Sequence, residues 1–259
     1  VVKRHIQHIV ENLERRIVER PYKEAGDGVY VGENVEIGPF VAFDTRQGPI
    51  VIESGVVIGS HASLVGPLHI GAGAKILPHA ALLGRVALGE TTKIGGEVED
   101  SIVEPFSNKQ HYGFLGHSYV GSWVNLGAGT SNSDLKNTYG EVHLDVGGRR
   151  VSTGMQMLGC FLGDYVKSAV NTSIFTGKLV GPGSMLYGFV TTNVPSFVNY
   201  AKSFDQVTEI PVDVLESMQA RMFARRGKEP RPCDVALLRA MHARTQAERL
   251  EAVATPIHW

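Results

Sequence analysis

The sequence contains few cysteines, which limits the kinds of site that it can build. Of its 259 residues, only Cys160 and Cys233 are cysteines. Two isolated thiols cannot form a framework of several disulfides or a zinc site made of four cysteines. We therefore expect each to be a reduced thiol, which is typical of a cytoplasmic protein.

The sequence also lacks an excess of charge and a long apolar run. It has 25 Lys and Arg against 26 Asp and Glu, a formal net charge of -1, so no overall basic footprint indicates nucleic acid. No apolar run approaches the roughly 20 residues that span a bilayer, and charges interrupt the opening segment VVKRHIQHIVENLERR as they would not in a signal peptide. We expect neither nucleic acid nor membrane as a partner. The chain starts at Val1 rather than Met, which fits a piece of a longer protein or a processed chain.

Glycines and aliphatic residues are abundant, and the aliphatic residues follow a period of six. The sequence has 30 glycines but only 8% aromatic residues. A period of six fits neither a helix nor simple alternation, but it fits short strands joined by tight turns, each pointing one aliphatic side chain into a shared interior. Three such units would close a coil of about 18 residues, and coils would stack at the spacing of neighbouring strands. The sequence therefore predicts an all-β solenoid, a parallel β-helix. The unbroken run of aliphatic positions is Ile52, Ile58, Leu64, Ile70, Ile76, Leu82, Leu88 and Ile94.

The repeat divides the chain into three parts. It predicts a β-helix over 29–196, in which the period is lost at about 131–157. There YGEVHLDVGGRRVST alternates around two glycines, which predicts a loop or hairpin. Residues 1–28 predict an amphipathic helix and linker, either a lid on the first coil or a connection from a missing domain. Residues 197–259 predict an extension of two helices that folds back on the β-helix.

Cations cluster near the end of the first of these C-terminal helices. One interpretation is a solvated helix face, with positive charge placed favourably at the negative end of the helix dipole. The other is an anchor for the phosphate of a cofactor. The cluster consists of Arg221, Arg225, Arg226 and Lys228.

A polar segment, SNKQHYGFLGHSYVGSWVNLGAGT at 107–130, interrupts the regular repeat. The repeat resembles the left-handed β-helix of the hexapeptide-repeat acyltransferases. The pattern S-x-x-x-H-x-x-[YF]-x-G, followed by V-N-[IL]-G-A-G-T, resembles the acetyltransferase half of the bifunctional GlmU-like enzymes, which acetylate glucosamine 1-phosphate and then uridylate it. The resemblance implies a left-handed coil, a homotrimer and acetyl-CoA as co-substrate. No glycine-rich nucleotide loop of the uridylyltransferase half is found in this sequence, so we expect no nucleotidyl transfer from this chain.

The chemistry of acetyl transfer explains the histidine of this segment. A thioester is attacked by an uncharged amine, so a base must accept a proton, and imidazole is suited to this near neutral pH. His111 is the candidate base. The resemblance implies that Asn125 contacts the amino sugar. It also implies a group of residues that contact acetyl-CoA, namely Ala128, Gly129, Thr176 and Gly177.

Three positions depart from the pattern of the bifunctional enzymes. Phe114 replaces a tyrosine and loses a hydroxyl, Asp134 replaces an asparagine, and Glu99 lies near the position of a lysine that helps to hold the sugar phosphate. The acceptor is therefore left open as an amino sugar, its 1-phosphate or nucleotide, or another amine. Cations that would supply positive charge instead are Lys109, Lys136, Arg85 and Lys93.

Two other functions compete with acetyl transfer. The γ-class carbonic anhydrases share the repeat and hold a metal with an H-x4-H pair, but His111 and His117 are six residues apart, so no metal is predicted. A β-helix that only trimerises and regulates a nucleotidyltransferase is the second alternative. Separately, His61, His79 and Glu97 are spaced by 18 residues and are expected to stack as a surface ladder rather than as a metal site.

Overall fold

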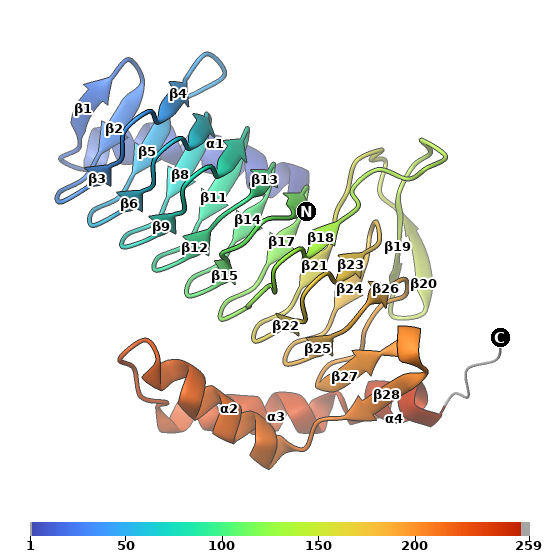
Figure 1. Ribbon diagram of the computed structural model, residues 1–259. Helices are drawn as coiled ribbons and strands as arrows, with labels where there is room; N and C mark the ends of the chain where they lie inside the picture. Colours follow the sequence, from blue (N-terminus) through green and yellow to red (C-terminus); the bar gives the residue numbers. More distant parts are fainter. Residues whose placement is uncertain (1, 255–259) are drawn as a thin grey trace.

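A computed structural model describes residues 2–254, with side chains from residue 11 to residue 252. Residues 1 and 255–259 of the two predicted terminal segments lie outside the described residues. The chain winds into stacked coils with parallel sheets along their sides (Figure 1). The prediction of an all-β solenoid of hexapeptide repeats is confirmed.

The first side of the solenoid is a nine-stranded sheet, in which β1 is antiparallel to β2 and the other pairs are parallel. In spatial order its strands are β1 (Lys23–Gly26), β2 (Val29–Val31), β5 (Ile50–Ile52), β8 (Leu68–Ile70), β11 (Val86–Leu88), β14 (Ile102–Val103), β17 (Tyr119–Val120), β21 (Phe161–Leu162) and β24 (Leu179–Val180).

The second side is formed by two sheets that Asn125 joins through isolated bridges to Asn108 and Lys167. Its strands are β3 (Glu36–Ile37), β6 (Val57–Ile58), β9 (Lys75–Ile76), β12 (Lys93–Ile94), β15 (Asn108–Lys109), β22 (Lys167–Ser168), β25 (Met185–Leu186), β27 (Val198–Ala201) and the antiparallel β28 (Gln206–Glu209). The third side contains β4 (Ala42–Asp44), β7 (Ser63–Val65), β10 (Ala81–Leu83), β13 (Glu97–Glu99), β16 (Phe114–Gly116), β18 (Ser131–Asn132), β23 (Ser173–Ile174) and β26 (Phe189–Val190).

The aliphatic residue of each hexad fills the interior. Ile52, Leu64 and Leu82 are each 0% exposed and belong to one continuous core cluster. Because each coil buries its apolar side chains against the coils on either side, the stack is held by contacts between neighbours. Cys160 is part of this core, where burial raises the pKa of its thiol to about 11, and both cysteines are free.

The coils are not all 18 residues long. Val57, Lys75 and Lys93 pair at steps of 18 residues, but Lys93 pairs with Asn108 after a step of 15. On the third side Glu97 pairs with Ala81. Shorter turns in the middle of the stack therefore shift every later register.

This shift corrects the predicted surface ladder. The rings of His61 and His79 do stack, with centroids 5.2 Å apart. Glu97 is not the next member, because it pairs with Ala81, two residues beyond His79. The exposed Phe40 occupies the other end, with its ring 5.0 Å from that of His61.

The N-terminal helix α1 (Val2–Glu19) runs along the first sheet instead of closing the first coil (Figure 1). Its Leu13 is buried, and its Arg16 donates to Glu53 of the coil at 2.8 Å. Glu53 also accepts from Tyr22 at 2.8 Å and contacts His69 at 3.1 Å. This hydrogen bonding from His69 and Tyr22 outweighs burial and lowers the pKa of Glu53 to about 2.

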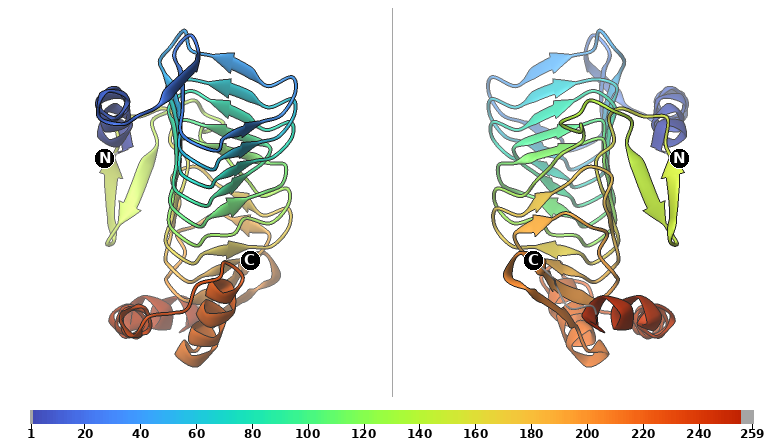
Figure 2. Two further views of the ribbon diagram at one scale, coloured as in Figure 1. Left: turned by 90° about the vertical axis from the view of Figure 1, so that its left-hand side faces the viewer. Right: turned by 90° about the vertical axis from the view of Figure 1, so that its right-hand side faces the viewer.

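The lost period at 131–157 belongs to an insertion that carries the hairpin of β19 (His143–Val146) and β20 (Arg149–Ser152). The hairpin projects from the coils on the same side as α1 (Figure 2). Strand β18 at its start still belongs to a coil. The insertion packs through Val142 and Leu158, which are both buried.

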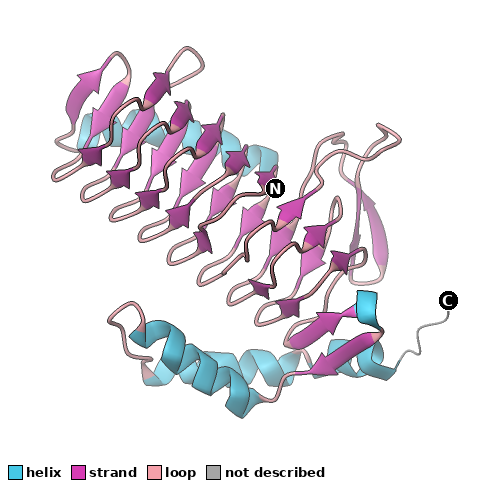
Figure 3. Ribbon diagram, in the orientation of Figure 1, coloured by secondary structure: helices cyan, strands magenta, loops and turns pink. Residues whose placement is uncertain are grey.

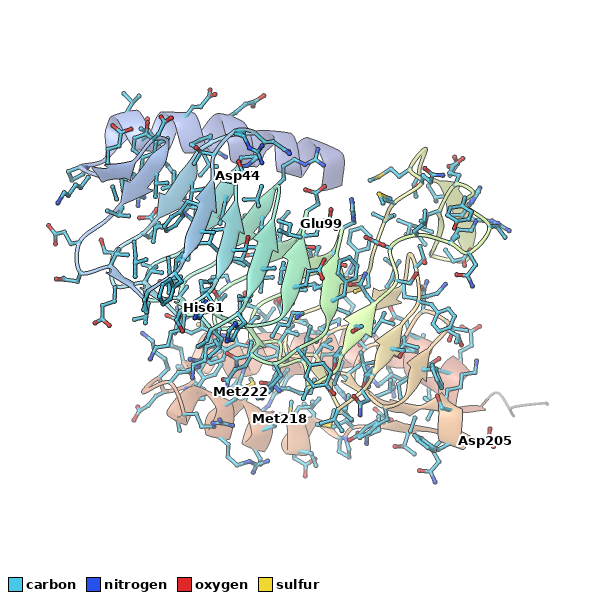
Figure 4. The ribbon with its side chains drawn as sticks, turned by 45° about the horizontal axis from the view of Figure 1, so that its top comes forward. Asp44, His61, Glu99, Asp205, Met218 and Met222 are labelled. Carbon is cyan, nitrogen blue, oxygen red and sulfur yellow. The ribbon has the colours of Figure 1, made fainter. Side chains whose placement is uncertain are left out.

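The C-terminal part contains three helices where two were expected: α2 (Val212–Ala224), α3 (Pro232–Arg244) and α4 (Gln246–Ala254), after the short helix η1 (Lys202–Phe204) (Figure 3). The second expected helix is divided at Thr245, whose hydroxyl donates to Met241 O and accepts from Arg249. The helices pack against the last coils through Phe197, and Met218 and Met222 lie on α2 beneath the coils (Figure 4). No helix among the described residues is long and apolar enough to cross a bilayer.

Candidate functional site

His111 lies on the turn between β15 and β16, and its side chain is exposed. The turn is held from inside by Lys109, which occupies the position of the aliphatic residue and pairs with Ile94. The Lys109 ammonium is 3% exposed and donates to the carbonyls of Gly95, at 2.8 Å, and Gly113. Burial lowers the pKa of Lys109 to about 8, against the opposing attraction of Glu97.

This geometry gives Lys109 a different place from the predicted one. Its ammonium is directed at backbone carbonyls inside the coil, so it is not available to a bound substrate. It instead fixes the backbone on both sides of His111, whose carbonyl is 3.4 Å from the ammonium. No described residue hydrogen-bonds to the His111 ring, which leaves the imidazole free to act on a ligand.

Ala128 and Gly129 lie one coil beyond the His111 turn and are joined to it through Tyr112. Gly129 N donates to Tyr112 O at 3.0 Å, and the Tyr112 hydroxyl donates to Asn171 Oδ1 at 3.2 Å. Gly129 has φ +75°, and a Cβ there would lie 2.1 Å from Asn171 Oδ1, so only glycine fits. The structure therefore brings these two predicted cofactor contacts close to the turn of the predicted base.

Phe114 and Asp134 meet at the next corner, beside His117. A Cβ on Gly116 would lie 2.3 Å from Phe114 Cζ and 2.5 Å from Asp134 Oδ2. The Asp134 carboxylate is nearly buried and contacts His117 Nδ1 at 2.8 Å. Asp134 is therefore already paired within the protein.

His117 is held between two carboxylates. Its Nε2 is 3.4 Å from Asp100 Oδ2, and Asp100 also accepts from Arg85, whose Nε is 3.0 Å away. Hydrogen bonding to Asp100, and then to Asp134, raises the pKa of His117 despite its burial. Burial alone would raise the pKa of Asp100, but hydrogen bonds from His117 and Arg85 hold it well below its usual range. A protonated imidazole with both nitrogens engaged is a structural ion pair and not a free base.

Sequence reasoning missed this charged cluster although a signal was present. Asp100, His117 and Asp134 are spaced by 17 residues. Since the coils on this side also advance by 17 residues, from Glu97 to Phe114 and then towards Ser131, the three side chains stack at one corner. The search used a step of 18 and so found only the histidine ladder.

Asn125 lies apart from these residues, on the second side. Its side chain is exposed and accepts from Asn108 Nδ2 at 3.3 Å. It lines a groove of about 250 Å³ between β12, β15, β22 and the end of α2. This groove also contains Lys93 but not His111.

Lys136 and Thr176 line a third place, a groove of about 770 Å³ beside the insertion. The Lys136 ammonium donates to Glu141 O at 2.6 Å, and Thr176 donates to Ser133 Oγ at 3.1 Å. Gly177 is buried with φ +68°, and a Cβ there would lie 2.8 Å from Val142 Cγ1. Gly177 therefore packs against the insertion, and no part of it is open to a cofactor.

The predicted residues thus occupy separate places on one protomer. His111, Ala128 and Gly129 come together, whereas Asn125 lies in one groove and Lys136 with Thr176 in another. The remaining residues, Lys109, Phe114, Asp134 and Gly177, support the coil turns. Among the residues from 2 to 254, no group of three His, Cys, Asp or Glu side chains is arranged to hold a metal ion.

Comparison with known proteins gives relatives for the solenoid. The chain is 34% identical over 106 residues to a bifunctional sugar-1-phosphate nucleotidylyltransferase/acetyltransferase of Sulfurisphaera tokodaii, a match that covers 40% of this chain and 26% of that protein. It is 35% identical over 141 residues to the bifunctional protein GlmU of Methanococcus maripaludis, covering 54% and 34% of the two chains. The chain thus spans about a quarter to a third of the length of these relatives. No family model matches the sequence.

A solved structure with a similar overall course is the UDP-N-acetylglucosamine acyltransferase of Francisella novicida. It is 13% identical, the superposition covers 89% of each chain, and the TM-score is 0.47. The functional comparison depends on the sequence relatives. The chain is a hexapeptide-repeat β-solenoid related to the GlmU-type bifunctional nucleotidylyltransferase/acetyltransferases.

Proposed function

We propose that the chain transfers the acetyl group of acetyl-CoA to the amino group of an amino sugar, with His111 as the general base. The observation that carries this proposal is the exposed His111 ring on a turn whose backbone Lys109 fixes. A base acts efficiently when it is held rigidly and its ring is free to accept a proton. The relation to bifunctional acetyltransferases supports the same chemistry.

The reaction requires one proton to move from the amine to the leaving thiolate. As the amine nitrogen attacks the thioester carbonyl, a C–N bond forms and the His111 ring accepts the amine proton. The tetrahedral intermediate then loses the coenzyme A thiolate as its C–S bond breaks, and the proton passes from His111 to the sulfur. Backbone N–H groups at glycine-rich turns would stabilise the oxyanion. We assign Ala128 and Gly129 to acetyl-CoA because they lie next to the His111 turn.

The acceptor contacts are completed between protomers in this proposal. On one protomer Asn125, Lys136 and Thr176 lie in grooves that do not contain His111. The flat sides of a solenoid can associate around a three-fold axis and bring different grooves together. We therefore propose a homotrimer, in which the His111 turn of one protomer faces Asn125, or Lys136 and Thr176, of another.

The test is an acetyl-transfer assay with purified chain. Acetyl-CoA is offered with glucosamine, glucosamine 1-phosphate and a UDP-linked amino sugar, and release of the coenzyme A thiol is followed together with the acetylated product. We expect turnover with at least one amino sugar and none with the matching N-acetylated sugar. Thiol release at the same rate with both kinds of sugar would contradict the proposal.

A second function is favoured by one observation, namely that Asp134 is engaged with His117 and so is not directed at a substrate. In that function the solenoid trimerises and stabilises a nucleotidyltransferase without catalysis. The two are separated by adding coenzyme A and measuring the melting temperature. An acetyltransferase is stabilised because coenzyme A binds the folded state, whereas a purely structural solenoid is not.

A further inference from the structure

The end of α2 forms a groove against the second side of the solenoid. Arg226 Nη2 donates to Asn108 Oδ1 at 2.6 Å, which fixes the helix end over β15. Beside it, the Trp123 ring is stacked between Phe106 at 4.5 Å and Phe223 at 4.3 Å. The groove of about 250 Å³ therefore lies between two rigid walls.

The charged groups that line this groove are all cations. They are Lys93 and Lys167 from the sheet, and Arg225 and Arg226 from the helix end. None of the described residues that line it is Asp or Glu. The neutral acceptors nearby are already used, since Asn108 accepts from Arg226 and the Trp123 carbonyl accepts from Lys167.

Burial and mutual repulsion make this arrangement costly for the protein alone. Burial lowers the pKa of Lys167 to about 7. Burial also lowers the pKa of Lys93, with further lowering from Arg226, Lys75 and Arg225, and it lowers that of Arg226 in the same way. Like charges brought together out of water require a counter-charge.

The helix dipole accounts for only half of the cluster. Cations at the end of α2 are stabilised by the negative end of that helix, which would explain Arg225 and Arg226. It does not explain Lys93 and Lys167, which come from strands β12 and β22 of different coils. The four cations converge because two separate elements meet, and this is the arrangement expected around an anion.

We infer that this groove binds the phosphate group of a small-molecule ligand. Its volume is below the range of pockets that enclose whole drug-sized ligands, so it fits a phosphate with the adjoining part of the molecule. Lysines and arginines would bind the phosphate oxygens, and the amides of Asn125 and Gln110 would donate to neighbouring oxygens. A nucleobase has no free stacking face here, because both faces of the Trp123 ring are covered.

The groove is adjacent to the proposed base, since its lining residue Gln110 precedes His111. A phosphate here could belong to an amino sugar 1-phosphate or to coenzyme A. This choice of source rests on the proposed acetyl transfer, whereas phosphate binding itself does not.

The first experiment measures binding of inorganic phosphate and pyrophosphate by calorimetry in low-salt buffer. We expect Arg226→Gln and Lys93→Gln each to weaken binding about tenfold, the loss of one charge-assisted contact. The matched control is Arg221→Gln, which removes the same charge from an exposed position of the same helix, and it should change binding less than about twofold. Lys93→Gln tests the groove even if Arg226→Gln releases the helix end. Absence of phosphate binding, or equal weakening by Arg221→Gln, would overturn the inference.

The second experiment identifies the source of the phosphate. Affinities of wild type and Lys93→Gln are compared for glucosamine 1-phosphate against glucosamine, and for coenzyme A against dephospho-coenzyme A. A loss of about tenfold confined to one phosphorylated partner supports the inference and identifies the ligand. If Lys93→Gln weakens neither, the inference is overturned. Phosphate binding without any acetyl transfer would refute the proposed function and leave the groove assignment standing.

Discussion

At the scale of single residues, a buried lysine controls the position of an exposed histidine. Lys109 occupies an interior position that the repeat otherwise gives to an aliphatic side chain, and its ammonium reaches the carbonyls of Gly95 and Gly113. The polar interruption of the sequence is therefore an internal support as much as an exposed site. Its ammonium contributes to function by fixing the backbone around His111.

Replacing Lys109 by methionine tests this support. Lys109→Met leaves the Gly95 and Gly113 carbonyls without their buried donor, so we expect a loss of about 1–3 kcal/mol in the free energy of unfolding. Urea denaturation measures it, and Lys75→Met, at an exposed position of the same side, should change stability by less than about 0.5 kcal/mol. Equal stability of Lys109→Met and wild type would contradict the role of the ammonium.

The His117 cluster predicts a pH dependence of stability. The pKa of His117 is raised in the folded protein, so its ion pairs stabilise the fold fully below the unfolded pKa of about 6.5 and progressively less as the pH rises through the folded pKa. The stability advantage of wild type over His117→Gln should therefore fall by about 1 kcal/mol or more as the pH rises from about 6 to about 9. His61→Gln, on an exposed corner, should show no such trend. An advantage that grows with pH would refute the assignment.

At the scale of elements, the coils obey the sequence pattern more closely than the connections do. The period of six predicted the interior of the solenoid because each strand has one buried position, and Ile52, Leu64 and Leu82 occupy it. Turn lengths could not be predicted in this way, because a turn can lose residues without disturbing the buried positions on either side. Those losses moved Glu97 out of the histidine ladder and stacked Asp100 beside His117.

The candidate site was only partly predictable for the same reason. His111 and Gly129 belong to one continuous segment, and the structure brings their turns together. Asn125 and Lys167 form a groove only because α2 returns from the far end of the chain, and spacing within the repeat carries no information about that return. The division of the last helical segment at Thr245 likewise depends on its contact with Arg249.

The docking of α2 should depend on its aromatic contact. Phe223 is 7% exposed and stacks on Trp123, so Phe223→Ala should reduce the stability of this helix by about 3 kcal/mol. Hydrogen exchange of the α2 amides reports this loss directly. Leu237→Ala, at an exposed position of α3, serves as the control. Unchanged exchange in Phe223→Ala would mean that the stack does not hold the helix.

At the scale of the whole molecule, a rigid solenoid separates the groups that the proposed reaction needs. His111 and the two other sets of predicted contacts lie on different parts of the prism surface. A stack of coils held by neighbour contacts cannot fold these parts onto one another. The proposed activity therefore requires a neighbouring protomer.

The oligomeric state provides the corresponding prediction. Light scattering after gel filtration should give three times the chain mass of 28.1 kDa, and acetyl transfer should fall when dilution dissociates the assembly. A fully active monomer would contradict the proposal that sites are completed between protomers.

The central claim is that the imidazole of His111 accepts the amine proton during acetyl transfer. The most direct measurement compares kcat of the wild type, His111→Ala and the control His79→Ala, which removes an exposed histidine from another corner, using acetyl-CoA and the best amino sugar. Loss of a general base predicts a fall of about 100-fold or more in kcat for His111→Ala, with His79→Ala close to wild type. Equal kcat values for all three proteins would show that His111 is not the base.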